Sequence, residues 1–172
     1  FLILSFKGVA GVDGVEARYM VRGAITNSTT LSFNRVSTST NGVEVAWEVV
    51  SMSDGTTVQS GSRSTAATSN TILDQAITAV DLSRSFAYIS AQGGSGTATA
   101  TLDEVAWTAA LTSATNLRLQ RAGTGTNGTV NWQVIQFAAA AAPTINSLSP
   151  TSGPVGTSVT ISGSNFGATQ GT

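Results

Sequence analysis

The sequence predicts an all-β protein, a β-sandwich or jelly roll that contains an internal repeat of about 85 residues. Three observations lead to this prediction. Apolar and polar residues alternate with a period of two in several short runs. Turn-forming dipeptides separate these runs. A framework in the first third of the chain also recurs later, which is typical of structural or display proteins rather than of proteins built around one catalytic pocket.

The repeat relates residues 21–50 to residues 107–135, with offsets of 86 and then 85 residues. Residues 1–5 align with residues 86–90 at the same offset of 85. The matching pairs are Ile25 with Leu111, Leu31 with Leu117, Phe33 with Leu119, Arg35 with Arg121, Asn41-Gly42 with Asn127-Gly128, Trp47 with Trp132 and Val49 with Val134.

Alternation identifies the strands, since side chains of a strand point to opposite faces in turn. In residues 43–49 the valines and Trp47 share one face, and Glu44 and Glu48 lie on the other. Asn-Gly and Asp-Gly pairs supply the positive φ that tight hairpin turns require. We expect strands near residues 1–6, 16–25, 29–36, 43–51, 55–60, 86–91, 98–111, 115–121 and 129–137, with a short strand or one helical turn inside 71–83.

The composition changes after Phe137, which predicts a repeated β-sandwich domain over residues 1–137, a linker over 138–143 and a separate segment over 144–172. That last segment carries a run of spaced motifs: Pro143-x-Ile145, Leu148-Ser-Pro150, Gly153-Pro-x-Gly156, Val159-x-Ile161 and Gly163-x-x-Phe166-Gly167.

These motifs resemble the opening strands of an IPT/TIG domain, an immunoglobulin-like module. The resemblance implies a spacer or binding module of surface and extracellular proteins, with no catalytic residues to transfer. The 85-residue repeats resemble tandem β-repeats of bacterial surface or secreted proteins. Together they favour an extracellular or cell-surface location.

Composition excludes several classes of function. The chain has one lysine and seven scattered arginines with a net charge of −1, so nucleic-acid binding is not expected. The absence of cysteine rules out disulfides and thiolate metal sites. No apolar run approaches the ~18 residues of a membrane span, so we expect no membrane insertion.

Candidate catalytic groups are also missing from the sequence. Without histidine there is no Ser-His-Asp triad. Glu44 and Glu48 are ~13 Å apart on an extended strand, which is too far for a glycosidase pair. The adjacent Asp103 and Glu104 would point to opposite faces of a strand. We therefore expect no enzyme, no cofactor and no metal centre; Asp13 with Glu16 is at most a weak calcium site.

Aromatic and basic residues supply the remaining candidates. Trp47 and Trp132 lie among inward-facing valines and are expected in the core. Trp107 and Tyr19 stand outside the repeated framework and are the candidates for an exposed ligand contact. Arg35 and Arg121 are the basic residues retained in both copies. One interpretation is structural: each caps a sheet end or forms a salt bridge to a carboxylate. The other is an interface contact that is repeated along a polymer.

The C-terminal segment predicts self-association. Its apolar positions Val159 and Ile161, with Ile145 and Leu148, would form an exposed strand with unpaired edge groups, which invites pairing. Either the chain is an ordered fragment of a longer protein, or these strands complete a neighbouring subunit in trans. We expect a structural subunit of an extracellular filament or fibre; the alternatives are a carbohydrate-binding or adhesin module of a secreted protein with a glycan or cell-surface partner, and a phage fibre protein.

Overall fold

The computed structural model describes residues 1–9, 18–36, 42–66, 71–94 and 100–167. The chain divides into two compact units, Phe1–Ala138 and Ala139–Thr172, and each is described by itself below.

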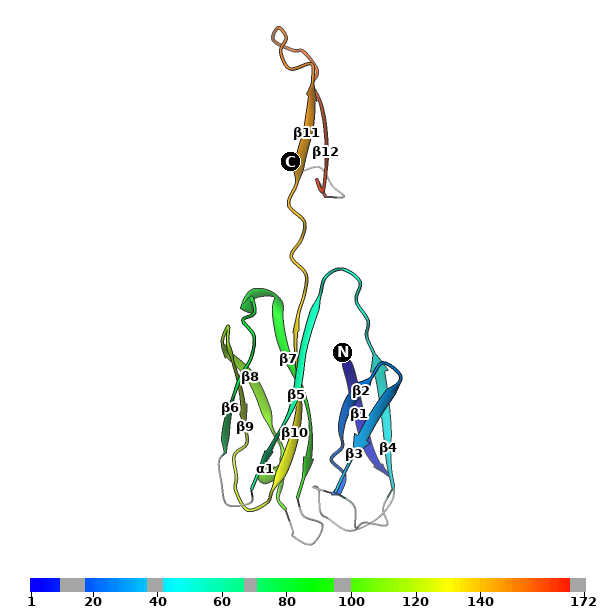
Figure 1. The fold of residues 1–172 in the computed structure, drawn as a ribbon, viewed down its shortest axis with the longest axis vertical. Helices are drawn as coiled ribbons and strands as arrows, with labels where there is room; N and C mark the ends of the chain where they lie inside the picture. The colour runs from blue at the N-terminus through cyan, green and yellow to red at the C-terminus, as the bar shows by residue number, and fades with distance from the viewer. Residues whose placement is uncertain (10–17, 37–41, 67–70, 95–99, 168–172) are drawn as a thin grey trace. The chain divides into compact units, whose positions relative to one another are not determined.

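The first unit begins with four strands, which we call the first copy (Figure 1). They are β1 (Leu2–Val9), β2 (Arg22–Asn27), β3 (Thr30–Asn34) and β4 (Gly42–Val49). β1 pairs with β4 and β2 pairs with β3, both antiparallel, so that the first copy consists of two sheets of two strands each.

Six strands follow, which we call the second copy. They are β5 (Thr57–Thr65), β6 (Ile72–Ala76), β7 (Ser85–Gly93), β8 (Thr108–Ser113), β9 (Asn116–Gln120) and β10 (Gly128–Gln136). They form two antiparallel sheets of three strands, ordered β5-β10-β7 and β6-β9-β8. The prediction of an all-β, sandwich-like fold is confirmed, and the sheets are antiparallel.

The repeat found in the sequence maps strand onto strand. β7, β8, β9 and β10 stand at the positions of β1, β2, β3 and β4, one repeat later in the chain. β5 and β6 then add a third strand to each sheet of the second copy: β5 pairs with β10, and β6 pairs with β9. Asp54-Gly55, predicted as a turn, precedes β5, and Gly55 has the positive φ of 92° that a glycine permits.

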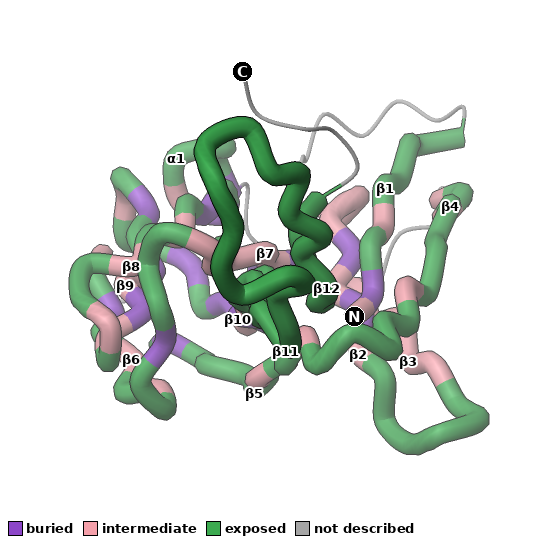
Figure 2. Tube along the Cα trace, turned by 90° about the horizontal axis from the view of Figure 1, so that it is seen from above, coloured by how far each residue is buried: buried purple, intermediate pink, exposed green. Residues whose placement is uncertain are grey.

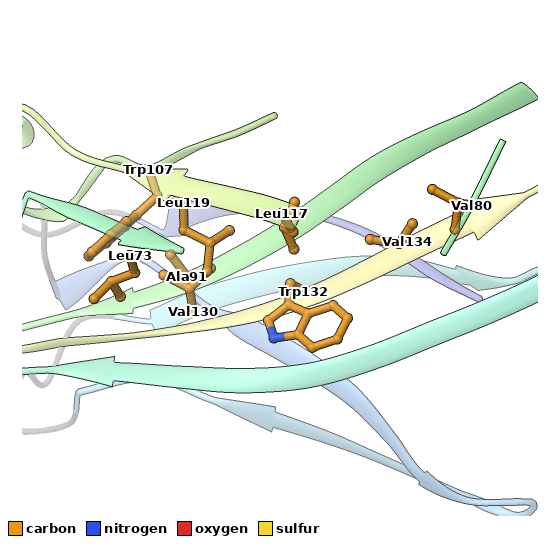
Figure 3. Close-up of a cluster of buried hydrophobic side chains, with 9 residues drawn as sticks. All are labelled: Leu73, Val80, Ala91, Trp107, Leu117, Leu119, Val130, Trp132 and Val134. Carbon is orange, nitrogen blue, oxygen red and sulfur yellow. The ribbon is translucent and has the colours of Figure 1, made fainter. Parts of the chain in front are cut away.

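The hydrophobic core lies between the two sheets of the second copy (Figure 3). Trp132, Val130 and Val134 of β10 belong to the same buried cluster as Leu117 and Leu119 of β9. All five are at most 6% exposed. The core cluster also contains Leu73, Val80, Ala91 and Trp107.

Two predicted strands differ from those in the structure. Within the predicted strand over 98–111, a short helix α1 (Leu102–Val105) precedes β8. The carboxylate of Glu104 accepts a hydrogen bond from the backbone N–H of Thr101, at 3.2 Å, as in a helix-starting Thr-x-x-Glu pattern. Of the strand predicted over 16–25, residues 16 and 17 lie outside the described residues, and β2 begins at Arg22. Residues 71–83, expected to hold a short strand or one helical turn, contain β6 and the start of a 3₁₀ turn, Leu82–Arg84.

The second unit contains a two-stranded antiparallel hairpin, β11 (Thr144–Ser149) and β12 (Thr160–Ser164). Leu148 is opposite Ile161 in this hairpin. Every residue of both strands is exposed, and the tube in Figure 2 is green along the whole hairpin. Its strands therefore satisfy each other's hydrogen bonds along one edge without burying their apolar side chains.

Candidate functional site

The first and second copies meet through an interface in which side chains bind backbone. Gln133, on the outer face of β10, accepts a hydrogen bond from the Leu2 N–H and donates one to the Leu2 carbonyl, both at 2.8 Å. The amide thus takes the place of a neighbouring strand along the free edge of β1. Leu2 is only 1% exposed in this position.

Tyr88 of β7 binds Leu4 in the same way. Its hydroxyl accepts from the Leu4 N–H at 2.8 Å and donates to the Leu4 carbonyl at 2.7 Å. Two further side chains share the backbone of Gly23 in β2. Ser90 accepts from its N–H at 3.0 Å, and Asn131 donates to its carbonyl at 3.0 Å.

Arg22 closes this interface from the side of β2. Its guanidinium donates to Gln92 at 2.7 Å and to Asn131 at 3.2 Å. Each of these hydrogen bonds contributes about 0.5–1.5 kcal/mol net, but leaving a buried backbone group unpaired costs about 1–3 kcal/mol. The contact therefore depends on satisfied backbone groups at the edges of β1 and β2, together with the side chain of Arg22.

The two copies differ at their equivalent tryptophans. Trp132 is 6% exposed and lies against Gly61 of β5, directly opposite in the register; a Cβ at Gly61 would be 2.6 Å from its Cζ2 atom. Trp47 is 52% exposed and contacts Phe33, with ring centroids 6.3 Å apart. The expectation that Trp47 is buried in the core is wrong, because nothing among the described residues occupies the place that β5 has beside Trp132.

Trp107 and Arg121 correct two further expectations. Trp107 is 9% exposed and Arg121 is 2% exposed, so neither is an accessible ligand or subunit contact in this unit. The Arg121 guanidinium lies 5.1 Å from the centre of the Trp107 ring and donates to the carbonyls of Glu104 and Thr126, at 2.8 and 2.7 Å. Burial lowers the pKa of Arg121, and the nearby Glu104 charge opposes this shift. Arg121 closes a loop, in line with the capping role that was the other interpretation.

Tyr19 and Arg35 are both half-buried. The Tyr19 ring packs on the backbone of β1, since a Cβ at Gly8 would be 2.8 Å from its Cδ1 atom. The ligand-contact role of Tyr19 and the interface role of Arg35 stay predictions. Asp13 and Glu16, the weak calcium candidates, lie outside the described residues.

The four apolar interface candidates of the C-terminal segment are all exposed. Ile145 is 60%, Leu148 44%, Val159 49% and Ile161 55% exposed. Ile145, Leu148 and Ile161 are paired within the hairpin and Val159 directly precedes β12, yet none of the four side chains is covered. Their role as subunit-interface residues stays a prediction.

The described residues hold no cluster of three or more histidine, cysteine, aspartate or glutamate side chains suited to a metal ion. The most strongly perturbed carboxyl groups are surface residues in ion pairs. Arg118 and Asn116 hydrogen-bond to Asp74 and lower its pKa to about 2. Ser83 and Arg84 do the same for Asp81. In the part of the chain that is described, no helix is long and apolar enough to cross a membrane.

Comparison with known proteins identifies the C-terminal segment. Residues 143–172 match the family model of the IPT/TIG domain. This segment is therefore an IPT/TIG-type, immunoglobulin-like sequence, a kind of domain that is non-catalytic and occurs in extracellular or surface proteins. No curated protein and no solved structure matches the chain.

The polar residues at the contact between the copies were not among the site residues predicted from the sequence. Asn131 and Gln133 alternate with Val130, Trp132 and Val134, as polar residues of any half-buried strand do. The signal lies in a departure from the repeat: the equivalent positions in the first copy are Ala46 and Glu48. A polar pair that is present in one copy and absent from the other indicates a contact made by that copy alone.

Proposed function

We propose that this chain is a structural, non-catalytic subunit of an extracellular or cell-surface filament or fibre, which self-associates through β-strand and subunit contacts. The observation that carries this proposal is the docking of the first copy on the second. Gln133, Tyr88, Ser90 and Asn131 bind the backbone of edge strands rather than a defined side-chain pattern. Such contacts suit proteins in which similar β-units follow one another.

The exposed hairpin supplies a second contact in this proposal. β11 and β12 form a sheet of two strands, and sheets of this size are marginal unless something covers their apolar face. Ile145, Leu148 and Ile161 would be buried when strands of a second copy of this chain pack on the hairpin. Contacts of this kind that do not close on themselves produce filaments.

The surface location rests on the IPT/TIG match and on composition. Such domains occur in extracellular or surface proteins. The chain has 10% charged residues, against roughly 25% in average soluble domains. Its surface is instead rich in serine, threonine and glycine, which fits an exported β-protein.

Electron microscopy and sedimentation velocity of the purified chain test this proposal. We expect concentration-dependent assembly that the variant Ile161→Asp abolishes, because a carboxylate would be buried in the contact. Ser162→Asp places the same charge on the neighbouring residue of β12, whose side chain points to the opposite face, and should leave assembly intact. A chain that stays monomeric at all concentrations, or equal effects of both variants, would contradict the proposal.

One observation favours the alternative of a carbohydrate-binding or adhesin module. Trp47 is half-exposed, whereas Trp107 and Trp132 are buried, so Trp47 is the tryptophan that offers a ring face to a sugar. Residues of β1 and β4, including Trp47 and Glu48, line a shallow groove of about 220 Å³. A glycan screen that finds binding, lost in Trp47→Ala and retained in Trp107→Phe, would establish this alternative.

A further inference from the structure

Two tripeptides of the sequence have the form Asn-x-Thr without an intervening proline. They are Asn27-Ser28-Thr29 and Asn127-Gly128-Thr129. This pattern is the acceptor for N-linked glycans, in which the side-chain amide nitrogen of the asparagine carries the sugar. Because so short a pattern also arises by chance, its backbone setting decides which asparagine can react.

The first tripeptide forms the tip of a hairpin. Asn27 ends β2, Thr30 begins β3, and Ser28 and Thr29 make the loop between them, with all four residues exposed. The side-chain carbonyl of Asn27 accepts hydrogen bonds from the N–H of Thr29 at 2.9 Å and from its hydroxyl at 3.1 Å. This asparagine-closed turn brings the amide and the hydroxyl of the acceptor pattern together on an accessible loop.

The second tripeptide lies at the start of a central strand. Gly128 is buried, and Gly128 and Thr129 belong to β10, which pairs with β5 along one edge and with β7 along the other. The hydroxyl of Thr129 hydrogen-bonds to that of Ser64 across the sheet at 3.0 Å. The carbonyl of Asn127 accepts from the Gly94 N–H at 2.8 Å. Although the side chain of Asn127 is exposed, its tripeptide is accessible on all sides only when β10 leaves both neighbours.

The chemistry requires access of this kind. The pattern demands both the asparagine and the hydroxyl two residues later, so an enzyme that reads it has to enclose both. The donor is an oligosaccharide linked to a lipid diphosphate. The amide nitrogen bonds to C1 of the first sugar, the bond from C1 to the diphosphate oxygen breaks, the lipid diphosphate leaves, and one amide proton passes to a base. Nothing is oxidised or reduced.

We propose that Asn27 is an N-glycosylation site of the folded protein and that Asn127 is not. The inference rests on the proposed function for the location alone, because an exported chain is the one that meets a lipid-linked donor. A glycan at Asn27 is compatible with the contact between the copies. Ser90 and Asn131 bind the backbone of Gly23, which is four residues and about 13 Å of extended strand away from Asn27.

The test uses the full chain and a purified oligosaccharyltransferase with its lipid-linked donor. The enzyme is one that accepts free peptides of residues 24–32 and 124–132, each of which contains one tripeptide. Intact mass and peptide mapping of the folded chain should show one glycan, at Asn27. Asn127 should react at least about a hundredfold more slowly in the folded chain than in its peptide, because it is accessible only when β10 opens.

Matched variants separate the acceptor from its surroundings. Asn27→Gln and Thr29→Ala should abolish the addition, the first by removing the acceptor and the second by removing the hydroxyl. Thr29→Ser keeps a hydroxyl and should still be modified. Asn127→Gln should be modified like the original chain. Circular dichroism confirms that each variant is folded, as expected for changes at exposed positions.

Three outcomes would overturn the inference. These are a folded chain that stays unmodified while its 24–32 peptide is glycosylated, a glycan on Asn127 of the folded chain, and unchanged modification of Thr29→Ala. Addition at Asn27 alone, with both peptides accepted, would support it. Monomers suffice for this reaction, so a chain that forms no filaments would count against the proposed function and leave this result unaffected.

Discussion

The two copies of the repeat carry nearly the same framework, yet only one of them closes its core. The first copy has two sheets of two strands, and the second has two sheets of three. Leu31 and Phe33 in the first copy are half-buried, whereas their equivalents Leu117 and Leu119 are 0% exposed. The apolar pattern of a strand therefore specifies which face turns inward, while burial depends on whether a third strand is present.

The open copy is held by the closed one rather than by its own core. Gln133 and Tyr88 satisfy the edge of β1, and Asn131 and Ser90 satisfy the backbone at Gly23. These polar contacts stabilise two-stranded sheets that would be only marginally stable by themselves. The difference between the two copies can be tested in four ways.

Replacing the equivalent tryptophans should give very different losses of stability. Trp132→Ala opens a cavity in a closed core and should lower the free energy of unfolding by about 3–5 kcal/mol. Trp47→Ala removes a ring that is half in water already and should cost no more than about 1.5 kcal/mol. Urea unfolding followed by circular dichroism measures both. Similar losses would show that Trp47 is covered in solution, as by a bound strand.

Adding a valine side chain on the inner or the outer face of β5 should show whether packing against Trp132 or strand propensity dominates the stability. Gly61→Val places a side chain against Trp132 and should destabilise the chain by about 1–3 kcal/mol through overpacking, although valine favours strands. Ser62→Val, on the outer face of the same strand, should be neutral or slightly stabilising. Thermal unfolding of the two variants gives the comparison, and a stabilised Gly61→Val protein would rule out close packing of glycine and indole.

Sequence reasoning predicted the fold where the pattern is local. Alternation and turns indicated the strands of both copies, and the repeat aligned Trp47 with Trp132. Flanking valines predicted that Trp47 is buried, but they flank Trp132 as well, and only Trp132 is covered by β5. The alternation around a tryptophan does not show whether such a neighbouring strand is present. Trp107 was predicted to be exposed because it departs from the repeat. It is buried because it belongs to the hydrophobic core of the second copy, where Arg121 also packs on its ring.

Removing one hydroxyl should loosen the first copy selectively. Tyr88→Phe leaves the backbone N–H and carbonyl of Leu4 without their partner, at a cost of about 1–2 kcal/mol. We expect faster hydrogen exchange in β1 with little change in β9. Ser60→Ala, which deletes an exposed hydroxyl on β5, serves as the control. Uniformly faster exchange across both copies would show that the copies unfold together and that the contact is not a separate unit of stability.

Lowering the pH should change the stability of the protein least of all, and only in the second copy. Arg118 of β9 and Asn116 hold the pKa of Asp74 on β6 at about 2, below its ordinary 3.8. Because the folded-state pKa is the lower one, this contribution is complete above about pH 4 and is lost as the pH falls toward 2. The pair is exposed, so the loss is small.

The first copy has Ser32 at the position of Arg118, so it has no counterpart to this ion pair. Between pH 4 and pH 2, hydrogen exchange corrected for its intrinsic pH dependence should therefore quicken in β6 while β3 is unchanged. Asp74→Asn should remove this pH dependence. Asp81→Asn should retain it, because the low pKa of Asp81 arises from Ser83 and Arg84 at the turn before β7. If both variants removed it, the acid effect would belong to the whole second copy, and the pairing of β6 with β9 would not depend on the charge of Asp74.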